Sequence, residues 1–219
     1  MMTKSFESEN LEIVVHPAVQ HKLLRLRDVN TGKAVFSQLL KEIGLLLGYE
    51  ITKNLDVTPA EVETPMGKCS GNEIAQSEIV IIPILRAGLG MTDGFIELLP
   101  GATVGHIGCY RDEKTKQPVE YMVEIPEYKG QTYIIVDPML ATGNSAKYAT
   151  DILKRHGVPG KNIRFMALVA APEGVGRFHE AHPDVYLLVA AVDSHLDENA
   201  YIVPGLGDAG DRLFGTSHE

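Results

Sequence analysis

Apolar residues near the start of the chain recur at helical spacing and predict two helices. The first follows His16-Pro17, and the second follows Asn30-Thr31, which we expect to cap it. The second helix would carry Val35, Leu39, Leu40, Ile43, Leu46 and Leu47 at helical spacing, as expected of a helix that packs on the core. We therefore expect a helical extension over residues 1–55. Prolines, glycines and β-branched residues over 56–71 predict short strands and turns there.

From residue 78 onward, short apolar runs alternate with segments that are compatible with helices. The runs lack a strict apolar-polar alternation, which is typical of strands covered on both faces. They predict strands at Ile79–Leu85, Thr103–Cys109, Tyr133–Val136, Ile163–Val169 and Val185–Ala190. Helices are expected between them at Met91–Leu99, Ser145–His156 and Glu173–Ala181. This order predicts an α/β fold, a central mostly parallel sheet flanked by helices, in a single domain over 1–219.

One connection departs from the strand-helix alternation. A charged segment, residues 110–118, separates Thr103–Cys109 from the apolar run Val119–Ile125. Two strands joined by a polar loop form an antiparallel hairpin, so we expect a projecting β-hairpin arm at this point of the chain.

Charge and cysteine content exclude several classes of protein. The 219 residues include 29 acidic and 20 basic side chains, for a formal net charge of −9, which disfavours a general nucleic-acid or membrane-surface binder. Cys69 and Cys109 are far apart and belong to no metal-binding motif, so we expect free thiols in a cytoplasmic protein. The longest apolar run, residues 185–192, is too short to cross a membrane, and residues 1–10 lack a signal-peptide pattern.

The segment from Tyr133 to Ser145 carries the clearest chemical signal. An apolar strand ends on Asp137, and a short loop then leads into a helix. In an open parallel sheet, ligands bind beyond the carboxyl ends of the strands, so Asp137 would lie at the floor of such a crevice. Loop 141–145 offers backbone N–H groups, two hydroxyls and a helix N-terminus, which together suit a phosphate. A plain strand-turn-helix with a capping serine is the alternative interpretation of this segment.

With three further segments, this motif resembles the phosphoribosyltransferases, and more narrowly the uracil phosphoribosyltransferase family. The resemblance rests on Tyr133–Ser145, Pro83–Met91, Gly108–Asp112, Tyr201–Asp211 and the closing Phe214–Thr216. It implies the phosphoribosyltransferase fold and transfer of the phosphoribosyl group of 5-phospho-α-D-ribose 1-diphosphate (PRPP) to N1 of uracil, which gives UMP and diphosphate in pyrimidine salvage. This chain departs from the usual family pattern at Asn144, where glycine is the common residue.

The resemblance also implies roles for single residues. Arg86, Arg111, Asp137 and Asp208 would be catalytic, and guanidinium groups suit the diphosphate because they bind phosphate oxygens in bidentate fashion. PRPP would contact these four together with Pro138, Met139, Leu140, Ala141, Thr142, Gly143, Asn144 and Ser145. Within the C-terminal base-binding segment, residues 201–216, uracil would contact Ile202, Gly207, Asp208 and Ala209.

Cofactor, assembly and regulation follow from the same resemblance. Mg²⁺ would be held mainly by the substrate's diphosphate and ribose hydroxyls, with no metal site made of protein ligands alone. A homo-oligomer, a dimer or higher, is implied, for which the N-terminal helices are the candidate surface, and GTP is a possible effector. The family further implies a cis peptide bond at or next to Arg86.

Two alternatives for function stay open at this point. One is an RNA-binding pyrimidine regulator on the same fold, against which the net charge argues. The other is a phosphoribosyltransferase for another base. Two groups of polar residues predict no site: His179 with His182 is expected at the surface, and Asp193, His195, Asp197 and Glu198 are expected to be solvated.

Overall fold

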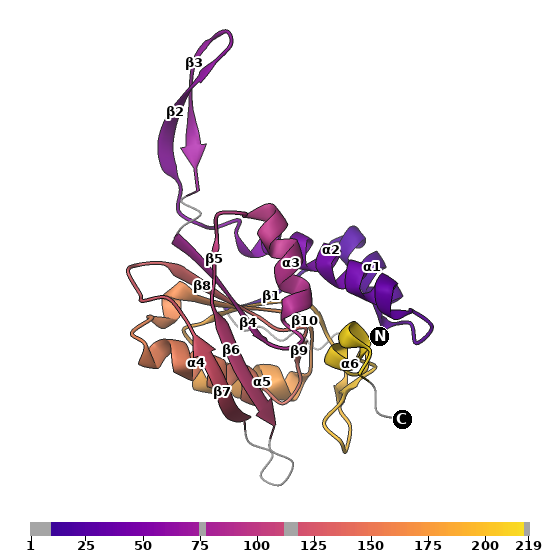
Figure 1. Ribbon diagram of the computed structural model, residues 1–219. Helices are drawn as coiled ribbons and strands as arrows, with labels where there is room; N and C mark the ends of the chain where they lie inside the picture. Colours follow the sequence, from indigo (N-terminus) through magenta and orange to yellow (C-terminus); the bar gives the residue numbers. More distant parts are fainter. Residues whose placement is uncertain (1–9, 75–77, 112–117, 217–219) are drawn as a thin grey trace.

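The computed structural model describes residues 10–74, 78–111 and 118–216. Within these residues a nine-stranded sheet has the order β1-β11-β10-β8-β4-β6-β7, with β5 beside β4 and β9 beside β10 (Figure 1). Its strands are β1 (Leu11–Ile13), β4 (Ile79–Leu85), β5 (Thr103–Val104), β6 (His106–Arg111), β7 (Pro118–Glu124), β8 (Thr132–Val136), β9 (Met139–Leu140), β10 (Ile163–Ala170) and β11 (Tyr186–Val192). In the sheet as described, every pairing but that of β6 with β7 is parallel, which confirms the predicted fold class.

Helices cover both faces of this sheet (Figure 1). Successive strand residues point to opposite faces, so in β4 Ile79 packs in one apolar cluster and its neighbour Val80 in the other. The first cluster includes residues of α1 (Pro17–Arg27), α2 (Lys33–Ile51) and α3 (Leu89–Leu98), and the second those of α4 (Asn144–Arg155) and α5 (Pro172–Ala181). Burial on both sides explains the uninterrupted apolar runs of the strands.

The predicted helices are present, but the expected cap of α2 is wrong. Gly32 occupies the N-cap position, and no side chain caps the helix. The Thr31 hydroxyl donates instead to the Arg25 carbonyl (2.6 Å), and the Asn30 backbone and side-chain N–H groups both bond to Asp28. Polar residues between two helices can satisfy either helix end, and here they close the end of α1.

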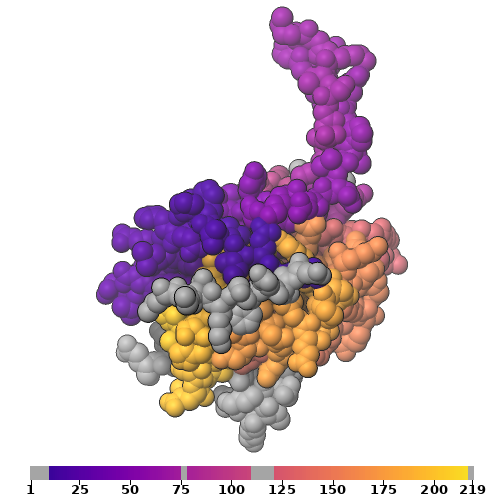
Figure 2. All heavy atoms as spheres, turned by 180° about the vertical axis from the view of Figure 1, so that it is seen from behind, coloured from indigo at the N-terminus to yellow at the C-terminus, as the bar shows by residue number. Residues whose placement is uncertain are grey.

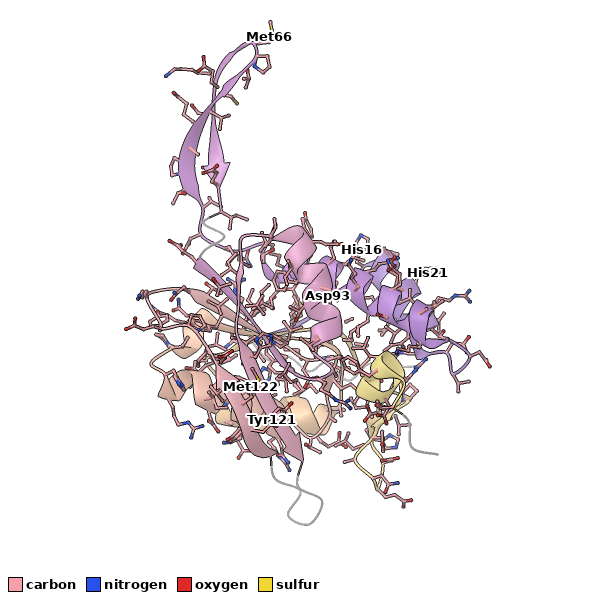
Figure 3. The ribbon with its side chains drawn as sticks, viewed as in Figure 1. His16, His21, Met66, Asp93, Tyr121 and Met122 are labelled. Carbon is pink, nitrogen blue, oxygen red and sulfur yellow. The ribbon has the colours of Figure 1, made fainter. Side chains whose placement is uncertain are left out.

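Two β-hairpins differ in how they join the body of the protein. The hairpin predicted around the charged segment is confirmed as β6 and β7, which pair antiparallel at the edge of the sheet, while the connecting residues 112–117 lie outside the described residues. A second hairpin, β2 (Thr58–Thr64) and β3 (Gly67–Glu73), comes from the segment predicted as short strands and turns. It stands clear of the body (Figures 1 and 2). Met66, at its tip, is 95% exposed (Figure 3).

The C-terminal part of the chain is tied to the first helix. After β11 come the short strands β12 (His195–Leu196) and β13 (Ile202–Val203), then α6 (Ala209–Phe214). Arg27 of α1 donates two hydrogen bonds of 2.7 Å to the Asp193 carboxylate, whose side chain is only 6% exposed, and a third to the Gly205 carbonyl (2.6 Å). The expectation that Asp193 is solvated is therefore wrong, because its partner comes from a distant helix.

Within the described residues, no helix combines the length and the apolar character needed to cross a membrane.

Candidate functional site

The site is built where neighbouring parallel strands end. Pro83 of β4 lies opposite Val136 of β8, so Arg86 and Asp137 follow the carboxyl ends of adjacent strands. Ligands of open parallel sheets bind at this edge, beyond the strand ends. The register of two buried strands therefore brings together two residues that are 51 positions apart in the sequence, as their numbers show.

A cavity of about 340 Å³ opens at this edge. Residues from three parts of the chain line it: Asp137 with Met139, Leu140, Ala141, Thr142, Gly143, Asn144, Ser145 and Ala146; Asn199, Ala200 and Tyr201; and Asp208. Most residues predicted to bind PRPP are thus neighbours around one space. Pro138 does not line it, since it is buried and its carbonyl accepts from the Leu168 and Val169 amides of β10 (3.1 and 3.2 Å).

The loop into α4 has the geometry of an anion cradle. Gly143 is the N-cap residue with a φ of 80°, a left-handed conformation that suits glycine and leaves α4 without a capping side chain. The Asn144 amide lies 3.4 Å from the Thr142 hydroxyl, and no acidic residue occupies the first turn of α4. The positive end of this twelve-residue helix therefore faces the cavity without a competing carboxylate of its own first turn.

Helix α5 supports the loop from behind through Gly174. A Cβ at this position would overlap the Ala141 carbonyl oxygen and lie 2.6 Å from the Leu140 carbonyl oxygen. A Cβ at Gly143 would in turn lie 2.8 Å from the Gly174 carbonyl oxygen. The two backbones touch, so the shape of the loop depends on the absence of a side chain at Gly174.

Asp137 is held in a setting that disfavours its charge. Burial raises its pKa to about 7, and the nearby Asp208 carboxylate raises it further, while a hydrogen bond from the Met139 amide opposes both. The neutral form of the carboxyl group is therefore favoured to a higher pH than in an ordinary aspartate. A cation or hydroxyl donors placed in the cavity would stabilise the charged form.

Arg86 and Arg111 are the two arginines predicted to bind the diphosphate, and the structure describes the side chain of Arg86 alone. Arg86 follows a cis Leu85–Arg86 peptide bond, as the family resemblance implies, and its exposed guanidinium lies 5.2 Å from the ring centre of Phe214. It does not line the cavity itself. Arg111 is the last residue of β6, and its side chain lies outside the part that the structure describes.

Among the four residues predicted to bind uracil, only Asp208 lines the cavity. Its carboxylate caps α6 by accepting a hydrogen bond from the Asp211 amide (2.9 Å). Ile202 and Ala209 are buried, and Gly207 has a φ of 78°. Residues 201–216 therefore line the cavity with Tyr201 and, at the N-cap of α6, with Asp208.

Sequence reasoning missed part of the cavity and misplaced a histidine. Asn199 and Ala200 line the space, but polar and small loop residues carry no signal of such a position. His182, expected at the surface, is 3% exposed and packs 5.7 Å from the Phe178 ring. Among the described residues, no group of three or more His, Cys, Asp or Glu side chains could hold a metal ion.

The contact between α5 and the loop predicts different effects for two glycines of the same helix. Gly174→Ala would force the loop or α5 to move and should lower the free energy of unfolding by about 1–3 kcal/mol. Gly176→Ala is the matched control, because nothing lies within 4 Å of its added Cβ. Alanine there should raise stability by roughly 0.5–1 kcal/mol through helix propensity. Urea unfolding of both variants measures this, and equal effects would contradict the close contact.

The raised pKa of Asp137 predicts a pH-dependent stability. Because its pKa of about 7 in the folded protein exceeds the ordinary value of 3.8, the folded state binds the proton more tightly. The resulting stabilisation is complete below about pH 4 and is lost as pH rises through 7.

Between pH 4 and 8, the unfolding free energy of the unliganded wild type should fall relative to Asp137→Asn by up to about 4 kcal/mol, less where cavity water solvates the carboxylate. Urea unfolding of both proteins across this range measures the difference. A constant difference would mean an ordinary pKa for Asp137.

The chain is similar to known proteins over nearly its whole length. The family model described as uracil phosphoribosyltransferase matches residues 13–216. Curated relatives named uracil phosphoribosyltransferase include one from Ralstonia pickettii, 56% identical over 209 residues, and one from Burkholderia thailandensis, 57% identical over 209 residues. Each alignment covers 95% of this chain and 96% of the relative.

Among solved structures, the AQ2163 protein from Aquifex aeolicus superposes with a TM-score of 0.90 at 37% identity, over 95% of this chain and 100% of that one. The family model covers nearly the whole chain, including the strand-loop-helix segment 133–145 and the C-terminal segment 201–216. The chain therefore belongs to the uracil phosphoribosyltransferase family.

Proposed function

We propose that this enzyme transfers the phosphoribosyl group of PRPP to N1 of uracil and releases UMP and diphosphate. The observation that carries the proposal is the strand-loop-helix segment 137–145, which forms one wall of the cavity. Family membership supports the reaction, and the residues around the cavity suit the 5-phosphate and the ribose of PRPP.

The 5-phosphate would occupy the loop 141–145. The backbone N–H groups at the start of α4 and the Thr142 and Ser145 hydroxyls are donors, and the helix dipole favours a negative charge there. The Asp137 carboxylate would accept hydrogen bonds from the ribose hydroxyls. Such bonds favour its charged form and would lower the pKa that burial raises in the free protein.

The diphosphate would be bound by Arg86 and Arg111, each of which follows or ends a strand at the same edge of the sheet. Within the described part of the chain, Arg86 has no carboxylate partner in an ion pair, so its charge is available to an anion. The contact with the Phe214 ring restricts the position of the Arg86 guanidinium and leaves its positive charge uncompensated.

The donor set fits a magnesium ion that the substrate carries. Asp137 and Asp208 share the cavity, and the repulsion that raises the pKa of Asp137 would be relieved by a cation between substrate and protein. Two carboxylates are too few to hold Mg²⁺ alone, so oxygens of the diphosphate and ribose would supply the other ligands. When bound, Mg²⁺ would offset the negative charge of the departing diphosphate.

Uracil would bind beside Asp208 against the segment 201–209. Backbone N–H and C=O groups of fixed polarity can pair with O2, N3–H and O4 of uracil, whereas cytosine reverses the donor and acceptor at ring position 3 and at the exocyclic position. Polar groups left unpaired in a buried site can discriminate by about 10⁴ to 10⁵. Ile202 and Ala209, both buried, would hold this segment in place.

In the reaction the bond from C1 to the diphosphate oxygen breaks while a bond from uracil N1 to C1 forms, and the N1 proton leaves. The transition state has oxocarbenium character at C1, and catalysis would come from positioning and from charge contacts rather than from a covalent intermediate. One oxygen of Asp208 caps α6, which favours a positioning role over that of a base.

We further propose that the protein acts as a homo-oligomer. An isolated two-stranded hairpin is only marginally stable in water, yet β2 and β3 extend from the body with Val62 and Met66 exposed. A second copy covering this arm would supply the missing packing, so the arm is a better candidate interface than the N-terminal helices. Regulation by GTP stays a prediction, because no observation among the described residues assigns a second nucleotide site.

Product analysis tests the proposed reaction. Incubation with PRPP, Mg²⁺ and labelled uracil, cytosine, hypoxanthine or guanine should give UMP from uracil, with activity on cytosine lower by about 10⁴ or more. A product from another base instead of UMP would identify a different phosphoribosyltransferase. RNA binding that strengthens at low salt, without UMP formation, would identify the RNA-binding regulator.

Arg86 provides the sharpest mutational test of the mechanism. Arg86→Ala should lower kcat/KM by roughly 10²- to 10³-fold, because one preorganised charge contact to the diphosphate is lost. Arg25→Ala removes an exposed arginine of α1 and serves as the control, with activity expected near that of the wild type. Near-normal turnover of Arg86→Ala, with an unchanged fold by circular dichroism, would remove Arg86 from the mechanism.

A further inference from the structure

A side chain from outside the loop holds Asn144. Arg177 of α5 donates a hydrogen bond from Nη1 to Asn144 Oδ1 at 2.8 Å. Asn144 is the first residue of α4, and it lines the cavity. The contact joins two helices at the point where both meet the loop.

The position of Arg177 is set by the packing of α5 against the loop. It lies three residues after Gly174, so both face the same side of the helix. A Cβ at Gly143 would lie 3.5 Å from the Arg177 Cβ, which places the base of this side chain beside the turn into α4. The guanidinium thus reaches Asn144 from a stem that is already packed against the loop.

The chemistry of the pair determines which way the Asn144 amide points. A guanidinium has only donors, so the amide must present its oxygen to Arg177 and its NH₂ group elsewhere. With the oxygen engaged, the two remaining N–H donors are the groups that the side chain can offer to a ligand. Arg177 thereby removes the orientation in which Asn144 would present an acceptor to an anion.

The positive charge of Arg177 also favours an anion in the loop. Arginine stays protonated at physiological pH, and within the described residues Arg177 forms no ion pair with an acidic side chain. Its positive charge therefore adds to the positive end of α4 next to the loop.

We propose that Arg177 is a positioning residue for the 5-phosphate of PRPP: it orients the Asn144 amide so that its Nδ2 donates to a phosphate in the loop 141–145. This inference rests on the proposed function, which places the 5-phosphate there. It assigns this chain a phosphate contact that a glycine at position 144 could not make.

Kinetics of single and double variants test the proposal. Arg177→Met and Asn144→Gly should each raise KM for PRPP about three- to tenfold, the range expected for one hydrogen bond, while kcat and KM for uracil stay within about twofold. The double variant should resemble either single variant, because both remove the same contact. Arg155→Met, an exposed arginine at the far end of α4, removes an equal charge and should leave KM for PRPP unchanged.

Binding of ribose 5-phosphate, measured by calorimetry, separates this inference from the proposed reaction. Loss of affinity in Arg177→Met and Asn144→Gly, even in a protein that forms no UMP, would support the orientation role while refuting the reaction. UMP formation with unchanged KM in Arg177→Met would overturn the inference alone. So would fully additive effects of the two substitutions, or an equal effect of Arg155→Met, since each would show that Arg177 does not act through Asn144.

Discussion

Parallel pairing of β4, β8 and β10 is the constraint on which the site depends. Parallel strands end at the same edge, so Arg86, Asp137 and the first turn of α5 all emerge there. Apolar side chains on both faces hold the register, because a slip of one residue would exchange the two buried faces of a strand. The polar groups of the cavity are thus positioned by residues that contact no ligand.

Local groups, rather than the field of the whole molecule, would account for anion binding in a protein of net charge −9. Helix α4 has Lys154 and Arg155 in its last turn and no acidic residue in its first, so the positive end of its dipole is left to the ligand. Arg177 reaches Asn144 at this end of the helix, and among the described residues neither Arg177 nor Arg86 forms an ion pair with an acidic side chain. The overall charge shows only which large anionic partners the protein disfavours.

A feature can be predicted from the sequence when consecutive residues form it, and it cannot when its residues come from distant parts of the chain. The segment from Asp137 to Ser145 forms its loop and helix start from consecutive residues, and the apolar runs indicate buried strands directly. Asp193 and Arg27 are 166 positions apart, and Arg177 and Asn144 are 33 apart. The polarity of a residue does not show which distant residue will pair with it. The sequence therefore predicts a solvated Asp193, and only the packing of α1 shows that Arg27 is its partner.

The C-terminal segment 201–216 is held by arginine side chains more than by its own strands. β12 and β13 have two residues each, too few to hold backbone groups at the fixed polarity that discrimination between bases requires. Arg27 binds the Asp193 carboxylate and the Gly205 carbonyl together, while Arg212 binds the Leu206 carbonyl at 2.7 Å. Lysine lacks the planar guanidinium group. It could not replace Arg27 in binding both carboxylate oxygens of Asp193 and the Gly205 carbonyl together. The bonds of Arg27 connect the segment that would recognise the base to the first helix of the chain, so the N-terminal helices are part of the support of the site.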